Sequence, residues 1–143
     1  MEPGRDFDVL IAGGGMVGAS LACALGGSGL KVGVVEAASL DGGEGASYDD
    51  RSIALALGTQ RIFAAMGLWP RVAPRTTPIE RIHVSDRGHF GALRMDSRKE
   101  GVPALGYVAE NRALGAALAG AMRTLNNLTL LCPAALEDLD DDE

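Results

Sequence analysis

The chain has 143 residues, of which 47% are hydrophobic and 22% are charged, so it is long enough to bury the core of one globular domain. No stretch reaches the about 18 uninterrupted apolar residues of a membrane span, and the N-terminus lacks a basic signal-peptide start, so we expect a cytoplasmic protein. The net charge is −6, but six of the 19 acidic residues lie in the last seven positions, and the neutral remainder argues against a nucleic-acid-binding surface.

The first predicted elements form one βαβ dinucleotide-binding unit. Residues 9–12 are a short apolar run typical of a strand buried in a parallel sheet, and the pattern Gly13-x-Gly15-x-x-Gly18 follows directly. In this pattern the first glycine permits a tight turn, the second lets a pyrophosphate approach the backbone, and the third lets the helix lie close to the strand. The free N–H groups and the positive dipole end of that helix then point at the phosphates.

The helix is predicted to begin at about Met16 and to end in the glycine-rich residues 26–29. Four apolar residues fall on one of its faces at helical spacing: Val17, Leu21, Ala24 and Leu25. Residues 30–35 are predicted as the second strand, and Glu36 at its carboxyl end is positioned to accept hydrogen bonds from a ribose hydroxyl pair. An acid at this position disfavours a phosphorylated ribose.

Residues 41–50 carry no apolar periodicity and are predicted as a loop. Thr59 is then expected to cap a helix that buries Ile62, Phe63 and Met66 and ends at Gly67. Another short piece of structure is expected to begin at residues 69–70.

Residues 79–85 and 91–95 are predicted as two strands joined by a turn around residues 86–88, which would be a hairpin inserted into the nucleotide-binding fold. Residues 107–109 indicate a further short strand. Asn111 is expected to cap a helix that carries Leu114, Leu118, Met122 and Leu125, and residues 128–131 are predicted as a third parallel strand.

These elements predict an α/β fold, namely a Rossmann-like βαβ domain with an inserted β-hairpin and a parallel sheet cut short after three strands. We expect residues 1–136 to be the N-terminal portion of a nucleotide-binding domain. Residues 137–143 are expected to form an acidic, disordered tail.

Four segments together resemble the flavoprotein aromatic hydroxylases, and within them the ubiquinone-biosynthesis branch. They are residues 8–19, residues 50–55 ahead of a helix ending in 67–69, residues 82–91, and residues 105–112. The run Ile-His-Val-Ser-Asp-Arg-Gly-His-Phe-Gly at 82–91 is similar to the hairpin of the octaprenyl-methoxyphenol hydroxylases. The resemblance covers nearly the whole chain.

The resemblance implies that the nucleotide is FAD, with its pyrophosphate over residues 13–18 and its adenosine ribose on Glu36. It also implies that Arg51 approaches the phosphate and ribityl region of the flavin and that Arg112 lies near the isoalloxazine; a guanidinium suits such contacts because its planar fork makes charge-assisted hydrogen bonds. The expected cofactor-binding residues are therefore Gly13, Gly15, Met16, Val17, Gly18, Glu36, Arg51 and Arg112.

The resemblance further implies NAD(P)H and dioxygen as co-substrates in the hydroxylation of a hydrophobic phenolic substrate, a polyprenyl phenol of ubiquinone biosynthesis. The resemblance also implies that the protein associates with a biosynthetic complex or with the periphery of the inner membrane. The second and third flavin motifs of the family, an Asp-Gly and a Gly-Asp sequence, are expected after residue 143. We therefore expect an N-terminal portion that is not catalytically complete, and we assign no catalytic residue.

Two other classes of protein remain open. The glycine pattern and Glu36 alone would fit an NAD-dependent dehydrogenase, although neither Tyr48 nor Tyr107 is followed four positions later by lysine. A nucleotide-binding or interaction module without turnover is the second alternative. His83 and His89 lack a third partner nearby, and Cys23 and Cys132 lack metal-ligand spacing, so no metal site is expected.

Overall fold

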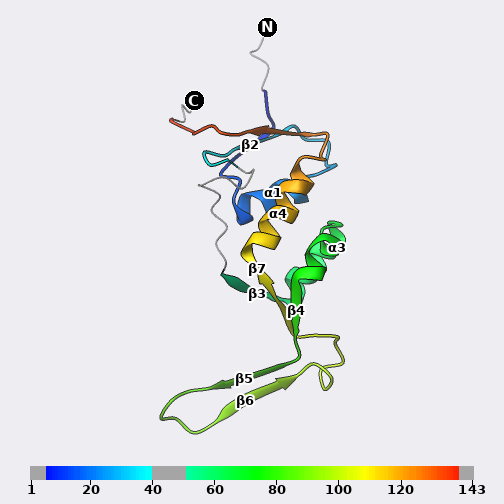
Figure 1. The fold of residues 1–143 in the computed structure, drawn as a ribbon, viewed down its shortest axis with the longest axis vertical. Helices are drawn as coiled ribbons and strands as arrows, with labels where there is room; N and C mark the ends of the chain where they lie inside the picture. The colour runs from blue at the N-terminus through cyan, green and yellow to red at the C-terminus, as the bar shows by residue number, and fades with distance from the viewer. Residues whose placement is uncertain (1–5, 40–50, 139–143) are drawn as a thin grey trace. The chain divides into compact units, whose positions relative to one another are not determined.

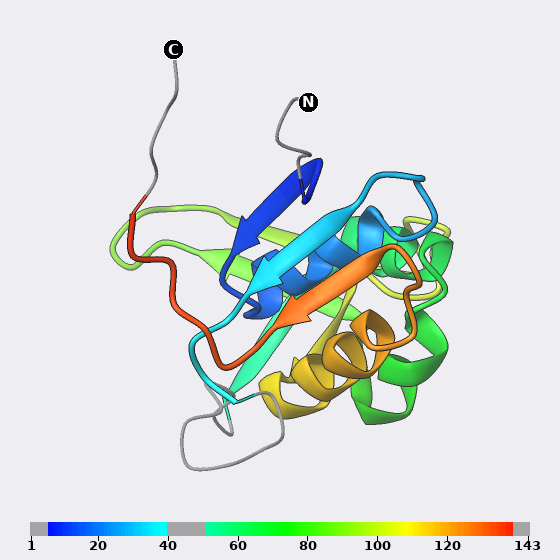
Figure 2. The same ribbon diagram turned by 90° about the horizontal axis from the view of Figure 1, so that it is seen from above.

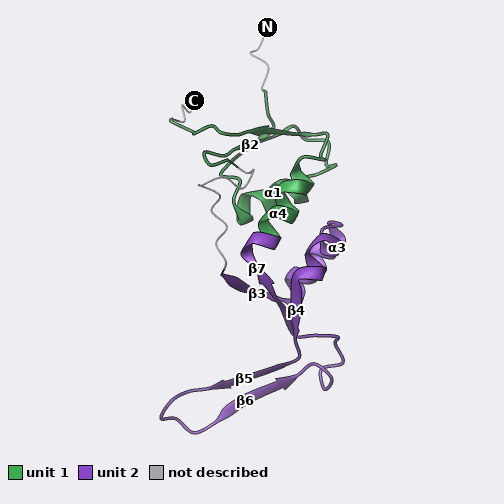
Figure 3. Ribbon diagram, in the orientation of Figure 1, with its two compact units in different colours: residues 1–49, 114–143 green, residues 50–113 purple. Residues whose placement is uncertain are grey.

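The computed structural model describes residues 6–39 and 51–138. The chain divides into two compact units, which are residues 1–49 with 114–143 and residues 50–113 (Figure 3). Each unit has its own β-sheet and its own buried side chains.

The sheet of the first unit is parallel and three-stranded. It consists of β1 (Val9–Ala12), β2 (Val32–Val35) and β8 (Leu128–Leu131), in the order β1-β2-β8. The three arrows lie side by side in Figure 2, with β2 in the middle. Every residue of β2 is buried, as expected of a central parallel strand. The three predicted strands are confirmed, although β2 begins two residues later than residue 30, where the prediction had it begin.

Helix α1 (Met16–Ala24) begins where the glycine pattern predicts, but the predicted apolar face is wrong. Val17 is 86% exposed and Leu21 is 49% exposed, whereas the buried residues of the helix are Ala19 and Ala22. The buried face is the opposite one, which carries these two alanines. Small side chains are needed on that face because they let the helix backbone lie close to the strands.

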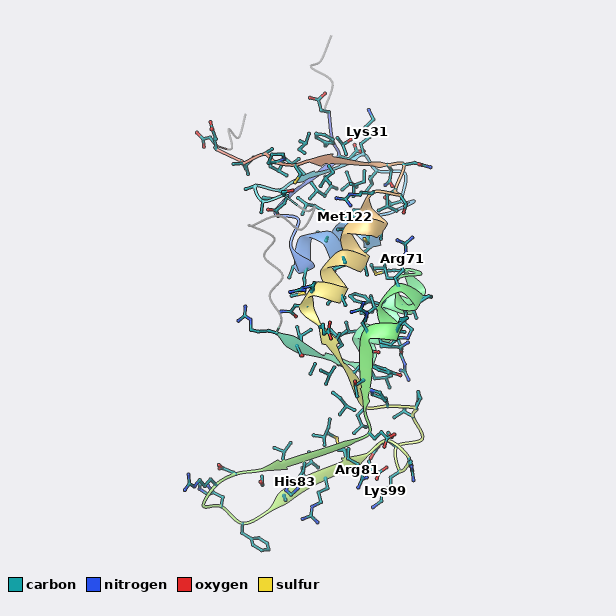
Figure 4. The ribbon with its side chains drawn as sticks, viewed as in Figure 1. Lys31, Arg71, Arg81, His83, Lys99 and Met122 are labelled. Carbon is teal, nitrogen blue, oxygen red and sulfur yellow. The ribbon has the colours of Figure 1, made fainter. Side chains whose placement is uncertain are left out.

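Helix α4 (Asn111–Met122) follows the prediction closely (Figure 1). Leu114, Leu118 and Met122 are all buried, and Met122 is labelled on the helix in Figure 4. The helix begins at Asn111 itself, and Leu125 lies beyond its last residue. Three of the four apolar residues predicted for this helix are therefore confirmed as buried helical residues.

The second unit contains an antiparallel sheet that the sequence reading predicted only in part. It consists of β3 (Ser52–Ala56), β7 (Gly106–Glu110) and β4 (Thr76–Ile79), in the order β3-β7-β4. Only the centre of β7 was predicted as a strand. Pro78 has no N–H to donate, and it lies on the edge strand β4, where a proline is tolerated.

Helix α2 (Leu57–Ala65) follows β3 without a break. The prediction that Thr59 caps it is wrong, because Thr59 lies in its first turn and the Leu57 N–H donates instead to the carbonyl oxygen of Leu105 at 3.3 Å. Phe63 is buried as predicted, but Ile62 is 59% exposed. Gly67 ends this segment at φ +71°, as predicted.

The short helices α3 (Trp69–Val72) and η1 (Ala73–Arg75) lead from α2 to β4. Trp69 makes an edge-to-face contact with Tyr107 of β7, with ring centroids 4.8 Å apart. The aromatic pair fixes α3 to the antiparallel sheet.

The predicted hairpin is confirmed as β5 (Arg81–Ser85) and β6 (Ala92–Asp96), which pair antiparallel. Ile79, predicted as its first residue, belongs to β4 instead. The predicted loop over residues 41–50 lies wholly outside the described residues, and so do residues 139–143 of the predicted tail. Glu137 and Asp138, the first two residues of that tail, are exposed. No helix in the described ranges is both long and apolar enough to cross a membrane.

Candidate nucleotide-binding site

Two of the three pattern glycines are required by the fold itself. Gly13 has φ +98°, a conformation that side-chain-bearing residues rarely adopt, and its N–H donates to the carbonyl oxygen of Val35 at 2.7 Å. A Cβ at Gly18 would overlap the carbonyl oxygen of Gly13 and lie 3.2 Å from Ile11 Cγ2. Gly13 therefore makes the turn, and Gly18 lets α1 approach β1.

Gly15 is different, because nothing in the described part of the chain requires a glycine there. It precedes α1 with φ −65° and ψ −176°, an ordinary extended conformation, and a Cβ at this position would meet no atom of residues 6–39 and 51–138 within 4 Å. The missing side chain leaves open space directly in front of the helix. That space is what a group bound at the helix N-terminus needs.

The N-terminus of α1 presents backbone donors toward this space. The first hydrogen bond of the helix runs from the Ala19 N–H to the Gly15 carbonyl oxygen, at 2.8 Å. The N–H groups of Met16, Val17 and Gly18 precede that bond and so have no carbonyl four residues earlier within the helix. Together with the positive end of the helix dipole, they form an arrangement suited to an anion such as a pyrophosphate.

Glu36 follows β2 and is held through its backbone and its side chain. Its N–H donates to the carbonyl oxygen of Leu131 at 2.9 Å, and its own carbonyl oxygen accepts from the Ala134 N–H at 2.8 Å. Its carboxylate accepts from the Gly14 N–H through Oε2 at 2.6 Å and from the Ala38 N–H through Oε1 at 2.7 Å. The predicted position of Glu36 at the carboxyl end of β2 is confirmed, and its side chain is fixed beside the glycine turn.

Sequence reasoning missed Gly14 and Ala38 as partners of this carboxylate. Gly14 is buried, and a Cβ there would lie 3.1 Å from the Cβ of Glu36. The three consecutive glycines at 13–15 were the available signal, since the pattern itself requires only the outer two. Ala38 contributes only a backbone N–H, and the sequence carries no signal for that contact.

Arg51 and Arg112 belong to the second unit, and both are exposed. Arg51 directly precedes β3, and Arg112 is the second residue of α4. The Asn111 N–H donates to the carbonyl oxygen of Arg51 at 2.9 Å, beside the last β3–β7 pair, Ser52 with Glu110. The structure thus brings the two predicted arginines to the same end of one pair of strands.

The remaining candidate residues form no site of their own. His89 Nδ1 lies 2.9 Å from Asp86 Oδ2 in the turn of the hairpin, and His83 lies opposite Arg94 in the β5–β6 register. Within residues 6–39 and 51–138, no group of three or more His, Cys, Asp or Glu could hold a metal ion. Cys132 Sγ lies 3.1 Å from the carbonyl oxygen of Ala38, beside the Glu36 tether.

A glycine turn, an open helix N-terminus and a tethered acid at the end of the second strand define a dinucleotide-binding βαβ domain. The FAD binding domain family matches residues 6–125. The chain belongs to this family, and FAD is the family's cofactor.

Among its relatives are enzymes of ubiquinone hydroxylation. The chain is 39% identical over 132 residues to the ubiquinone hydroxylase UbiL of Rhodospirillum rubrum, covering 92% of this chain and 30% of UbiL. It is 31% identical over 131 residues to the 3-demethoxyubiquinol 3-hydroxylase of Escherichia coli, covering 90% of this chain and 33% of that protein. The chain therefore spans about a third of the length of these relatives.

Solved structures share the fold. The flavin-dependent monooxygenase PieE, determined with FAD and substrate, superposes with a TM-score of 0.73 at 22% identity, over 99% of this chain and 26% of PieE. PqsL of Pseudomonas aeruginosa, determined with 2-aminobenzoylacetate, superposes with a TM-score of 0.73 at 25% identity, over 97% of this chain and 36% of PqsL. The resemblance to flavoprotein hydroxylases is confirmed at the level of family and fold.

Proposed function

We propose that residues 1–136 are the N-terminal portion of the FAD-binding domain of an aromatic-ring monooxygenase that hydroxylates a polyprenyl phenol in ubiquinone biosynthesis, with NAD(P)H and dioxygen as co-substrates. The names of the relatives support the substrate class and the reaction. Bound FAD would supply the redox chemistry, and this chain would supply binding and orientation. We assign no part in nucleotide binding to the acidic residues 137–143.

The open space in front of α1, next to the tethered carboxylate of Glu36, carries the proposal. The pyrophosphate of FAD would accept hydrogen bonds from the N–H groups of Met16, Val17 and Gly18, with Gly13 and Gly15 keeping side chains out of its way. The adenosine ribose would donate its hydroxyl hydrogens to Glu36.

Arg51 and Arg112 complete the proposed set from the second unit. Both residues are exposed, and the planar fork of a guanidinium suits a phosphate or a polar ring edge. We assign Arg51 to the phosphate and ribityl region and Arg112 to the isoalloxazine side.

A substitution at Gly15 tests the proposal sharply, because the described part of the chain has room for the added methyl group. Gly15→Ala should keep the fold and weaken FAD binding about ten- to a hundredfold, since its Cβ occupies the space assigned to the pyrophosphate. Gly58→Ala in α2 is the matched control, because a Cβ there also meets no described atom within 4 Å and Gly58 is not one of the proposed cofactor-binding residues. Both variants should keep the circular dichroism of the wild type.

FAD affinity would be measured by the quenching of flavin fluorescence on titration with protein, followed by gel filtration to detect retained flavin. Equal FAD affinity in Gly15→Ala and Gly58→Ala would contradict the assigned pyrophosphate position. Retention of NAD in preference to FAD would favour a dehydrogenase instead. FAD binding without turnover in the presence of NAD(P)H and a phenolic substrate would favour a nucleotide-binding module.

A further inference from the structure

The chain at the end of β8 holds the chain that leaves β2. The two parallel strands pair along their length, so their carboxyl ends lie side by side (Figure 2). Two backbone hydrogen bonds, of 2.9 and 2.8 Å, join Glu36 to residues 131–134. A third hydrogen bond comes from a side chain, because the Cys132 thiol donates to the carbonyl oxygen of Ala38 at 3.1 Å. The chain that leaves β2 is therefore held at two residues, Glu36 and Ala38.

Ala38 links this thiol to the carboxylate of Glu36. The Ala38 N–H donates to Glu36 Oε1 at 2.7 Å, while the Ala38 carbonyl oxygen accepts from Cys132. Because a hydrogen bond weakens steeply as its angle becomes less linear, the orientation of Ala38 decides how well its N–H meets Oε1. All three residues are partly buried, and hydrogen bonds are stronger there than in open water. The thiol thus acts on the carboxylate through Ala38.

We propose that Cys132 is a positioning residue for the adenosine ribose of FAD. This role rests on the proposed function, which assigns the ribose hydroxyls to Glu36. Cys132 fixes Ala38, whose N–H holds Oε1, while the Gly14 N–H holds Oε2. A carboxylate held at both oxygens directs its remaining lone pairs, so it discriminates between a ribose with both hydroxyls and one that lacks a hydroxyl.

Two flavin nucleotides separate ribose recognition from the rest of FAD binding. They are FAD and the FAD analogue whose adenosine carries a 2′-deoxyribose, and they differ by one hydroxyl group. Quenching of flavin fluorescence by the full chain gives both dissociation constants, and we define their ratio as the ribose preference. We expect a ribose preference of about tenfold in the wild type, because the analogue loses one hydrogen bond to a carboxylate.

Substitutions at the two cysteines test the role of the thiol. Cys132→Ala should lower the ribose preference about threefold, since it removes a weak donor that acts only through Ala38. Cys132→Ser keeps a donor and should stay within about twofold of the wild type. Cys23→Ala is the matched control and should leave the preference unchanged, because it makes the same change in the same unit, at a thiol 3.9 Å from the Leu118 carbonyl oxygen.

A double substitution shows whether the thiol acts through the carboxylate. In the Glu36→Gln background, Cys132→Ala should cause no further change in the ribose preference, because residues that act on the ligand through one group are not additive. A second measurement needs no ligand. In the free chain, the Ala38 amide hydrogen should exchange with solvent about threefold faster in Cys132→Ala than in the wild type, and at the wild-type rate in Cys23→Ala.

Several results would overturn this role of Cys132. They are a wild-type ribose preference in Cys132→Ala, an equal loss in Cys23→Ala, a loss in Cys132→Ser as large as in Cys132→Ala, and unchanged exchange of the Ala38 amide. A wild type that binds FAD and the analogue equally would also overturn it, and would leave the pyrophosphate assignment intact. Failure of the wild type to bind FAD would contradict the proposed function, and the exchange rates would still decide whether Cys132 positions Ala38.

Discussion

Replacing Glu36 by glutamine tests whether its carboxylate holds the glycine turn. The two carboxylate oxygens accept from the Gly14 N–H at 2.6 Å and from the Ala38 N–H at 2.7 Å. An amide keeps only one oxygen, so its NH2 group must face one of these two donors, and the other hydrogen bond loses its charge. An unsatisfied donor costs about 1–3 kcal/mol, and Glu36 is only partly buried, so we expect Glu36→Gln to lower the free energy of unfolding by about 2 kcal/mol.

Thermal unfolding followed by circular dichroism measures this loss, which corresponds to a melting temperature lower by about 6–8 °C in a chain of this size. Glu110→Gln is the matched control, because Glu110 is an exposed acid whose ion pair with Arg75 spans 3.9 Å and contributes about 0.5 kcal/mol or less. If Glu36→Gln melted within 2 °C of the wild type, or if both variants lost the same amount, the carboxylate would not be what holds the turn.

Substitutions at two further positions test the packing of the first unit by urea unfolding. Gly18→Ala places a Cβ against the Gly13 carbonyl oxygen and should cost about 3 kcal/mol, and a loss below about 1 kcal/mol would show that α1 can move away from β1. Asn127→Ala removes hydrogen bonds from Nδ2 to the carbonyl oxygens of Leu25 (3.0 Å) and Leu30 (2.9 Å), which fix the chain between α1 and β2. We expect it to cost about 1–2 kcal/mol, and Asn127→Asp, which lacks both donors, should cost at least as much; full stability of Asn127→Asp would contradict that role.

The first unit could be predicted from the sequence because its signals are local. A run of apolar residues, a turn of glycines and a helix follow one another within residues 9–24, and each is recognisable without its partners in space. The third parallel strand, residues 128–131, was predicted within its observed bounds for the same reason. The location of Glu36 at the carboxyl end of the second strand was also predicted from the sequence, because the acid directly follows the apolar run that forms β2.

Hydrophobic periodicity failed on α1 because it selects the largest apolar side chains, and here the smallest are buried. Val17 and Leu21 lie on the exposed face, while Ala19 and Ala22 are buried. A helix held close to its strand by a glycine has no room for a larger residue on that side. Gly18 carried the relevant signal, because a glycine at this position predicts that α1 lies close to β1. The face of α1 that packs against the strand must then consist of small residues.

The antiparallel sheet of the second unit could not be predicted from the sequences of its individual strands. Strand β3 pairs with β7, which lies about fifty residues further along the chain, and β3 buries only Leu55. A strand with one buried residue has no alternation of apolar and polar positions to detect. Strand β4 carries Pro78 and two threonines, a composition that also fits a turn.

The hydrogen bonds accepted by the Glu36 carboxylate hold this side chain against the glycine turn. A carboxylate has about four positions at which it can accept hydrogen bonds, and the N–H groups of Gly14 and Ala38 use two of them. Two ribose hydroxyls could therefore bind Glu36 in addition to its present partners, without displacing either one. Because the side chain is already ordered, ligand binding would lose little further conformational entropy at this residue, which favours affinity.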